Sequence, residues 1–245
     1  KEWVLDGASV SYGFAFELKG ALSHDIQRER DFKYTGMDMS EIVKHIAQFT
    51  SDIWQIHPFC EGNTRTTAVF IIKYLRSLGF DVNNTTFEKN SWYFRNALVR
   101  ANYQNLQKGI YKETIHLERF FRNLLMGEDN VLMNRHLHIK AKELLDGATP
   151  TSTPTSTPTS TPTSVIPESE NVKRLISAIA EKQLSVKEIM AAVGLKDRPN
   201  FIEYSLSPAM REGYVRMLYP DSPRHPRQKY LLTVKGLAAY KELSR

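Results

Sequence analysis

The feature that most constrains the fold is a low-complexity stretch late in the chain. Residues 149–164 repeat the tetrapeptide Thr-Pro-Thr-Ser four times. The repeats offer no apolar side chain to bury, and each proline fixes φ and removes a backbone donor, so they predict an extended, semi-stiff spacer. An O-glycosylated stalk has a similar composition and is the alternative. Because a single core cannot span such a stretch, we expect two domains, residues 1–147 and 167–245, joined by a linker at 148–166.

Composition and charge limit the class of protein. The chain is 41% hydrophobic and 24% charged, as globular proteins are, and Cys60 is its only cysteine, so we expect a reducing, cytoplasmic location. Neither an apolar run long enough to span a membrane nor a signal peptide is visible, although the start at Lys1 rather than Met suggests a preceding segment. Residues 168–245 hold 14 Lys and Arg against 9 Asp and Glu, so contact with a polyanion is most plausible there.

The spacing of apolar residues predicts a mainly helical first domain. Residues 40–56 carry an apolar stripe at helical spacing, and Asp38 and Glu41 form a capping-box pair before it. Residues 66–78 are apolar nearly all round, which is typical of a buried central helix. Further helices are expected over 91–103, 113–126 and 135–145.

The first residues of the chain follow a different pattern. Residues 2–12 contain two short β-prone runs on either side of Asp6-Gly7, so they predict a β-hairpin with a two-residue turn. The alternative is a surface hairpin that has no role in function.

The second domain combines a helix-turn-helix pattern with two strands. Helices are expected over 171–181, 186–193, 199–212 and from Val234 onward, and strands over 214–219 and 229–233. This order predicts a small winged helix (α+β), in which residues 220–228 form the wing. Its basic residues are candidates for nucleic-acid contacts: Arg216, Arg224, Arg227 and Lys229. Protein contacts or dimerisation are the alternative, because Glu203 and Glu212 lie on the helix that would read the bases.

The segment from His57 to Arg65, His-Pro-Phe-Cys-Glu-Gly-Asn-Thr-Arg, carries the chemistry. It lies between two apolar helices, so Gly62, Asn63 and Thr64 can point their backbone N–H groups at one anion, aided by the dipole of the following helix. The remaining groups suit a metal-bound phosphate. Glu61 offers a carboxylate to Mg²⁺, and Arg65 offers a bidentate charge to phosphate oxygens. His57 precedes this nest and has a side chain suited to general-base catalysis near neutral pH.

This segment resembles the signature of the Fic family (filamentation induced by cAMP), HPFx[D/E]GN[G/K]R. Seven specified positions match: His57, Pro58, Phe59, Glu61, Gly62, Asn63 and Arg65. The resemblance implies a helical Fic core with a β-hairpin flap, followed by the winged helix. It also implies ATP and Mg²⁺, with transfer of AMP to a Ser, Thr or Tyr hydroxyl of a target protein.

The resemblance also implies residue roles. His57 would be the general base, Phe59 would pack the loop into the core, and Glu61 would bind Mg²⁺. The nucleotide phosphates would contact Gly62, Asn63, Thr64 and Arg65. The flap residues Trp3, Val4 and Leu5 would dock the target by strand addition, and Asn96 and Tyr103 are candidates for contacting adenine, with a core role as the alternative.

Two positions depart from the family pattern. Thr64 stands where the family has Gly or Lys, and Ala68 stands where many members carry a second arginine that orients the γ-phosphate. The alternative function is therefore a nucleotide-sensing or DNA-binding regulator whose Fic core is inactive or transfers phosphate. The expected partners are a target protein and, through the winged helix, DNA; no membrane is expected, and homo-oligomer formation is left open.

Overall fold

A computed structural model describes residues 2–140 and 165–245, which form two compact units. Of these residues, the first unit holds 2–32, 43–71 and 83–140, and the second holds 33–42, 72–82 and 165–245. The linker expected at 148–166 lies almost entirely outside the described residues, so its boundaries stay a prediction. None of the described helices is long and apolar enough to cross a membrane.

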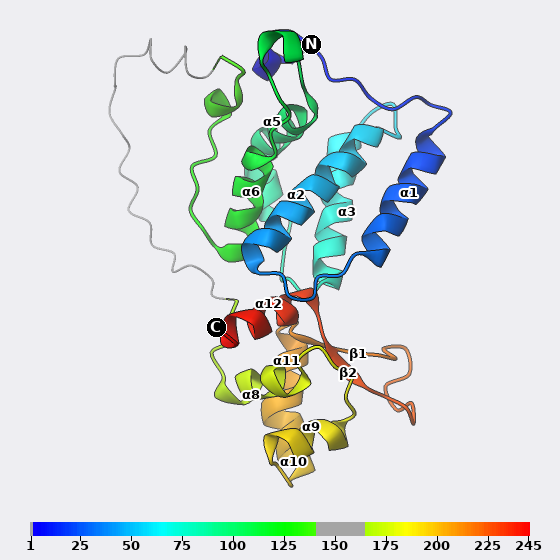
Figure 1. Ribbon diagram of the computed structural model, residues 1–245, viewed down its shortest axis with the longest axis vertical. Coiled ribbons are helices and arrows are strands. Elements are labelled where there is room, and N and C mark those ends of the chain that lie inside the picture. Colours follow the sequence, from blue (N-terminus) through cyan, green and yellow to red (C-terminus); the bar gives the residue numbers. More distant parts are fainter. Residues whose placement is uncertain (1, 141–164) are drawn as a thin grey trace. The chain divides into compact units, whose positions relative to one another are not determined.

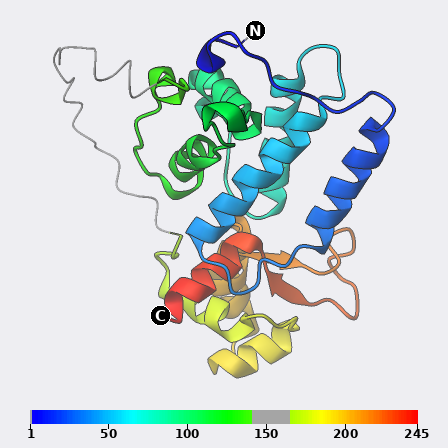
Figure 2. The ribbon, with the colours of Figure 1, turned by 45° about the horizontal axis from the view of Figure 1, so that its top comes forward.

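The first unit is helical, as predicted, and its main helices run side by side in two views (Figures 1 and 2). The α-helices are α1 (Leu18–Asp31), α2 (Met39–Ile56), α3 (Asn63–Ser77), α4 (Thr85–Lys89), α5 (Ser91–Asn102) and α6 (Ile115–Met126), of which α2 and α3 each have one end in the second unit. Short 3₁₀ helices are η1 (Trp3–Leu5), η2 (Leu106–Lys108) and η3 (Asn134–Leu137). The helix expected over 135–145 is replaced by η3 as far as Leu137, and its remainder falls largely outside the described residues.

Helix α2 forms the centre of the core, as its apolar stripe predicts. The stripe residues Ile42, Ile46, Phe49, Ile53 and Ile56 are all buried. Asp38 and Glu41 form the predicted capping box, with reciprocal backbone-to-carboxylate hydrogen bonds of 2.8 and 3.1 Å. Helix α3 differs from the expectation, because Val69 is 52% exposed, so this helix is not buried on every side.

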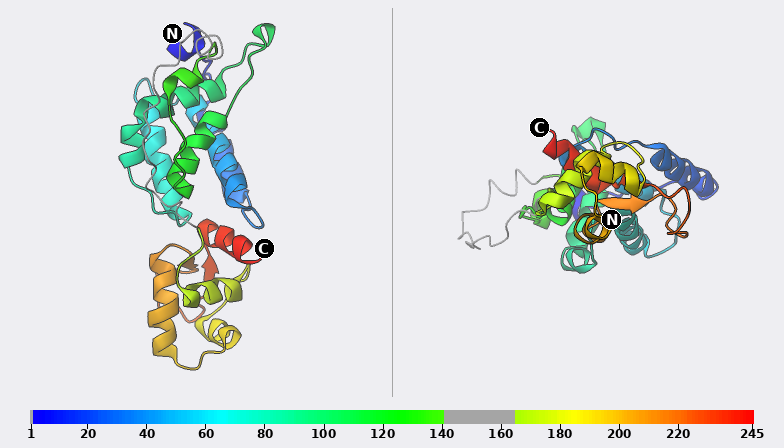
Figure 3. Two further views of the ribbon diagram at one scale, coloured as in Figure 1. Left: turned by 90° about the vertical axis from the view of Figure 1, so that its left-hand side faces the viewer. Right: turned by 90° about the horizontal axis from the view of Figure 1, so that it is seen from below.

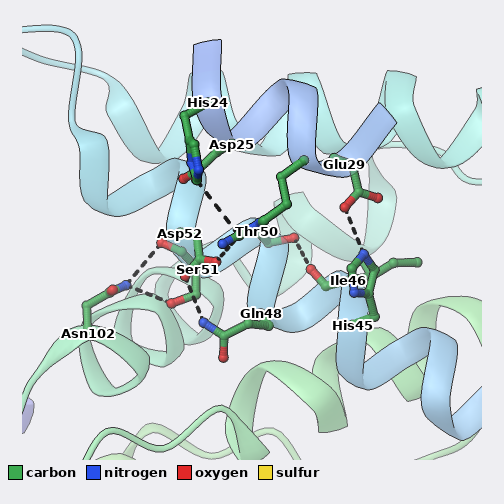
Figure 4. Close-up of polar contacts among 11 residues, drawn as sticks. His24, Asp25, Glu29, His45, Ile46, Gln48, Thr50, Ser51, Asp52 and Asn102 are labelled. Atoms are coloured by element: carbon green, nitrogen blue, oxygen red, sulfur yellow. Dashed lines mark hydrogen bonds and ion pairs between the residues drawn. The ribbon is translucent and has the colours of Figure 1, made fainter. Parts of the chain in front are cut away.

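Helix α1 was not predicted, because polar contacts rather than an apolar stripe hold it against α2 (Figure 4). Its buried Glu29 bonds to His45 Nε2 at 2.7 Å, and Arg28 bonds to Asp52 at 2.6 Å. On the other side of α2, the Asn102 amide of α5 donates to the Ser51 hydroxyl at 2.9 Å. Hydrogen bonds of this kind compensate for burying polar groups.

The β-hairpin expected over residues 2–12 is wrong, although its turn forms. Asp6 and Gly7 both have positive φ (54° and 82°), and the Ala8 N–H donates to the Leu5 carbonyl at 3.1 Å. The residues before the turn are η1 rather than a strand. Consecutive Val4 and Leu5 are 0% and 1% exposed, which a strand with alternating faces does not allow.

The C-terminal part of the second unit has the predicted element order (Figure 3). Its helices are α8 (Glu170–Ile179), α9 (Val186–Val193), α10 (Arg198–Phe201), α11 (Ser207–Arg211) and α12 (Val234–Leu243), with strands β1 (Val215–Met217) and β2 (Tyr230–Leu232). The strands pair antiparallel, with Val215 opposite Leu232, and Leu184 bridges to Tyr230. An unpredicted π-helical segment, η4 (Ile202–Leu206), joins α10 to α11. The name winged helix remains a prediction.

We predict that His116 makes stability depend on pH. Burial, aided by nearby positive charges and opposed by Glu113, lowers the pKa of this imidazole from 6.5 to about 4. As the pH falls through this range, the unfolded chain binds a proton that the folded chain does not, so folding loses up to about 1.4 kcal/mol for each pH unit. Urea unfolding at a series of pH values should show this slope, and it should shrink in His116→Gln; equal slopes in both proteins would refute the assignment.

Candidate active site

The loop between α2 and α3 begins and ends with left-handed backbone. His57, the residue after α2, has φ 54°, and Gly62, the residue before α3, has φ 77°. The first hydrogen bond of α3 runs from the Thr66 N–H to the Gly62 carbonyl at 2.9 Å. The N–H groups of residues 62–65 therefore precede the first helical hydrogen bond, and they form the positive end of the α3 dipole.

Asn63 closes this loop with its side chain. Its Oδ1 accepts from the Phe59 N–H at 3.0 Å, and its Nδ2 donates to the Phe59 carbonyl at 2.5 Å. Asn63 is only 5% exposed. The side chain therefore supports the loop, and what remains for the expected phosphate contact is the backbone N–H. Phe59 itself is 52% exposed, so the expectation that its ring packs into the core is wrong.

Thr64 ties the start of α3 to the end of α2. Its hydroxyl accepts a hydrogen bond from Trp54 Nε1 at 3.0 Å. The Trp54 ring is 1% exposed and lies edge-on to the His57 imidazole, with ring centroids 5.6 Å apart. A residue that departs from the family signature thus anchors the aromatic side chain that packs against His57.

The groups expected to bind a metal-bound phosphate lie at the open end of this loop. Glu61 and Arg65 are exposed, and a Cβ built on Gly62 would lie 3.6 Å from Arg65 Nη2, so the guanidinium lies over the Gly62 backbone. In the described ranges no three His, Cys, Asp or Glu side chains gather in a metal-binding group. This arrangement fits Mg²⁺, which takes one or two carboxylates and completes its coordination with phosphate and water.

Aromatic rings partly bury the His57 imidazole. The Tyr12 ring lies against it, with centroids 3.8 Å apart and planes 32° apart. Burial is the main cause that lowers the pKa of His57; the neighbouring Trp54 carbonyl opposes it, and the positive charge of Arg95 adds to it. His57 Nδ1 is buried and has no hydrogen-bond partner in the described part of the chain. The imidazole is therefore held neutral at physiological pH.

Sequence reasoning missed Tyr12, Trp54 and Arg95. Arg95 of α5 makes two hydrogen bonds to the Glu2 carboxylate, at 2.6 and 2.8 Å, and these lower the pKa of Glu2. No signal in the sequence links residues 2, 12 and 95, because their proximity depends on the tertiary fold. Trp54 was detectable only as part of the helix that leads into the loop.

The other predicted contact residues have different positions. Trp3, Val4 and Leu5 form η1 rather than a strand; Val4 and Leu5 are buried and Trp3 is 53% exposed, and docking of a target by these residues stays a prediction. Asn96 is 2% exposed and donates to Asn134 Oδ1 at 2.7 Å, which favours its core alternative over contact with adenine. Tyr103 is half-buried and remains a candidate.

The basic residues predicted to contact nucleic acid belong to the second unit and not to this site. Arg216 on β1 is exposed, as are Arg224 and Arg227 in the loop that follows it, and Lys229 is half-buried. Nucleic-acid binding by these residues stays a prediction.

Comparison with known proteins places this loop within a family. Residues 12–75 match the Fic/DOC family, and residues 170–233 match the C-terminal domain of "Filamentation induced by cAMP protein Fic-like". Together the two matches cover more than half of the chain. The chain belongs to the Fic family. The loop from His57 to Arg65 lies inside the first match.

A solved structure of a Fic family protein from Desulfovibrio desulfuricans G20 is also similar. The two chains are 20% identical with a TM-score of 0.30, and the similarity covers 91% of this chain. This chain spans 57% of the length of that protein. No curated protein matches.

We predict that Tyr12 keeps the pKa of His57 low. In an NMR titration, His57 should titrate below 6.5, its ordinary value. Tyr12→Ala should raise that pKa, because removing the stacked ring exposes the imidazole and favours its charged form. Tyr111→Ala, which removes a ring that is 64% exposed, is the matched control and should leave it unchanged. An unchanged His57 pKa in Tyr12→Ala would contradict the assignment.

A second prediction concerns the hydrogen bond between Trp54 and Thr64. A double-mutant cycle of Trp54→Phe and Thr64→Val should give a coupling of about 1 kcal/mol in the free energy of unfolding, the usual contribution of one hydrogen bond. Thr64→Ser keeps the acceptor and should cost much less than Thr64→Val. Strict additivity of the two single variants in urea unfolding would show that the bond does not contribute.

Proposed function

We propose that this Fic protein transfers AMP from ATP to a hydroxyl of a target protein. Membership of the family supports a transferase. The observation that carries the proposal is the placement of a neutral, partly buried histidine next to the open N-terminus of α3. One loop thus supplies a proton acceptor and an anion site, the two functions that phosphoryl chemistry requires of a protein.

In this proposal the triphosphate binds at the start of α3. The N–H groups of Gly62, Asn63 and Thr64 donate to phosphate oxygens, and the Arg65 guanidinium offsets their charge. Glu61 is the carboxylate that would hold Mg²⁺, which when bound neutralises charge on the leaving pyrophosphate. Position 68, where many members of the family carry a second arginine, is alanine in this chain.

The target hydroxyl attacks the α-phosphorus and its proton passes to His57. A bond forms between the hydroxyl oxygen and the α-phosphorus, and the bond from that phosphorus to pyrophosphate breaks. Because its pKa is lowered, His57 is neutral near pH 7 and accepts the proton. The target approaches along residues 11–14, which line a pocket of about 500 Å³ with Gln55 and Ile56 at the end of α2.

Labelled ATP tests the reaction. Incubation of cell lysate with the protein and α-labelled ATP should label a target, and γ-labelled ATP should not. His57→Asn should lower labelling by at least about a hundredfold, the usual contribution of a general base. Asparagine is the replacement of choice because it tolerates left-handed backbone, so the loop should keep its fold. Melting temperatures would verify this.

Two variants that each remove one positive charge from α3 distinguish ATP binding from the transfer reaction. Arg65→Ala should weaken ATP binding, whereas Lys73→Ala, which removes an exposed charge further along α3, should not. If only γ-labelled ATP labels a target, the protein transfers phosphate rather than AMP. That outcome would agree with the alanine at position 68, where many family members carry a second arginine. Nucleotide binding without any labelling would instead support the alternative function, a nucleotide-sensing regulator with an inactive Fic core.

A further inference from the structure

A basic pocket lies in the C-terminal part of the second unit, between α9 and the loop 218–229. Its volume is about 750 Å³, and a second pocket of about 620 Å³ shares Lys187 and Gln228 with it. We call the two together the α9 pocket. Its cationic residues come from both sides: Lys187, Arg198, Arg224, Arg227 and Lys229.

The cations that line the α9 pocket outnumber its carboxylates, because Glu188 is the single acidic side chain among the lining residues and it interacts with Lys229. In the described ranges Lys187, Arg198, Arg224 and Arg227 form no ion pair. Glu188 and Asp197, the sequence neighbours of Lys187 and Arg198, cap helices and form no ion pair with these cations in the described part of the chain. Glu188 accepts from the Ser185 N–H at 2.7 Å, and the Asp197 carboxylate accepts from the Asn200 amide at 2.7 Å. The free cations therefore favour an anionic partner.

The floor of the α9 pocket is apolar, which decides between two kinds of anion. It is lined by Val186, Met190, Ala191, Leu195 and Tyr230. Leu195 is 44% exposed. The phosphates of a nucleic acid pair with the cations alone, whereas a protein segment that mixes carboxylates with apolar side chains pairs with the cations and covers the apolar lining as well. Arginine, methionine and aromatic residues are also the types enriched in protein interfaces.

The loop that forms one wall is ordered by its own hydrogen bonds. The Gln228 side chain accepts from the Tyr219 N–H at 3.0 Å and donates to the Tyr219 carbonyl at 2.9 Å. The ring centroids of Tyr219 and His225 are 4.1 Å apart with the planes tilted by 33°, and His225 Nδ1 accepts a hydrogen bond from the Arg227 N–H. A preformed wall reduces the entropy that binding must overcome.

We propose that the α9 pocket binds an extended acidic segment of the protein that the transferase modifies. Carboxylates of the segment pair with Lys187, Arg198 and Arg224, and its apolar side chains lie on Met190 and Leu195. The identity of the partner rests on the proposed function, but the chemistry of the bound segment does not. The pocket thereby contributes to target selection apart from the catalytic loop.

Fluorescence anisotropy with the full chain tests the binding chemistry. The probe is a labelled peptide of Glu-Glu-Leu repeats; the comparison probes are peptides of Lys-Lys-Leu and Glu-Glu-Ser repeats and a duplex DNA of random sequence. We expect the Glu-Glu-Leu peptide to bind and the Lys-Lys-Leu peptide not to bind. The Glu-Glu-Ser peptide should bind more weakly, because it cannot cover the apolar floor.

Charge reversal locates the site. The double variant Arg198→Glu, Arg224→Glu should weaken binding of the Glu-Glu-Leu peptide by more than about tenfold. The matched control reverses two exposed arginines outside the pocket, Arg174→Glu with Arg211→Glu, and should leave binding unchanged. Equal loss in both double variants, binding of the duplex in preference to the peptide, or no binding of the peptide overturns the proposal.

Labelling in lysate then tests the partner. The pocket variant should label targets less than the wild type does while binding ATP equally well. Unchanged labelling would overturn the assignment of the partner even if the peptide binds. If wild type and His57→Asn label equally, the proposed reaction is wrong, yet the peptide measurements still decide the chemistry of the pocket, so the two failures are distinguishable.

Discussion

Two hydrogen bonds between the Asn63 side chain and the Phe59 backbone hold the loop on which the candidate site depends. They fix the turn from α2 into α3, so that one loop, from His57 to Gly62, joins the C-terminus of α2 to the N-terminus of α3. An amide serves this purpose well, because it donates and accepts at once and satisfies both backbone groups of Phe59. The same bonds leave the backbone N–H groups at the start of α3 available to an anion.

The electrostatics of the site favour a neutral base. Arg95 places permanent positive charge near an imidazole that Tyr12 and Trp54 already remove from water. Protonation of His57 would add a further buried charge to this surrounding, so the pKa falls. The group that we propose as the proton acceptor is thereby kept neutral, and the exposed guanidinium of Arg65 is left available to the proposed phosphate.

The sequence predicted those parts of the fold in which local pattern and burial agree. The stripe of Ile42, Ile46 and Phe49 identified α2, and the capping pair Asp38–Glu41 identified its start. Helix α1 escaped prediction because buried Glu29 and exposed Arg28 attach it through polar partners on α2, which no periodicity reveals. The hairpin failed for a related reason: Asp6-Gly7 does specify a turn, but burial of both Val4 and Leu5 against the helices overrides the strand.

The candidate site was predictable as a loop but not as a set of contacts. The order of His57, Glu61, Gly62 and Arg65 indicated a phosphate-binding turn, and the structure places them on the loop between α2 and α3 and in the first turn of α3. The Asn63 side chain proved to support the loop, which leaves its backbone N–H for the expected phosphate contact, and the Thr64 hydroxyl proved to be a partner of Trp54. Contacts from Tyr12 and Arg95 depend on how distant segments pack, so one sequence without homologues could not supply them.

The left-handed backbone of His57 bears on how the protein can evolve. A histidine in this conformation carries a strain of about 1–2 kcal/mol, which glycine or asparagine would relieve. The ring contacts with Tyr12 and Trp54 offset part of this strain, and selection for the proposed chemistry would favour keeping the histidine further. Among descendants of this chain, glycine or asparagine at position 57 would be the expected mark of a lineage that no longer uses the site.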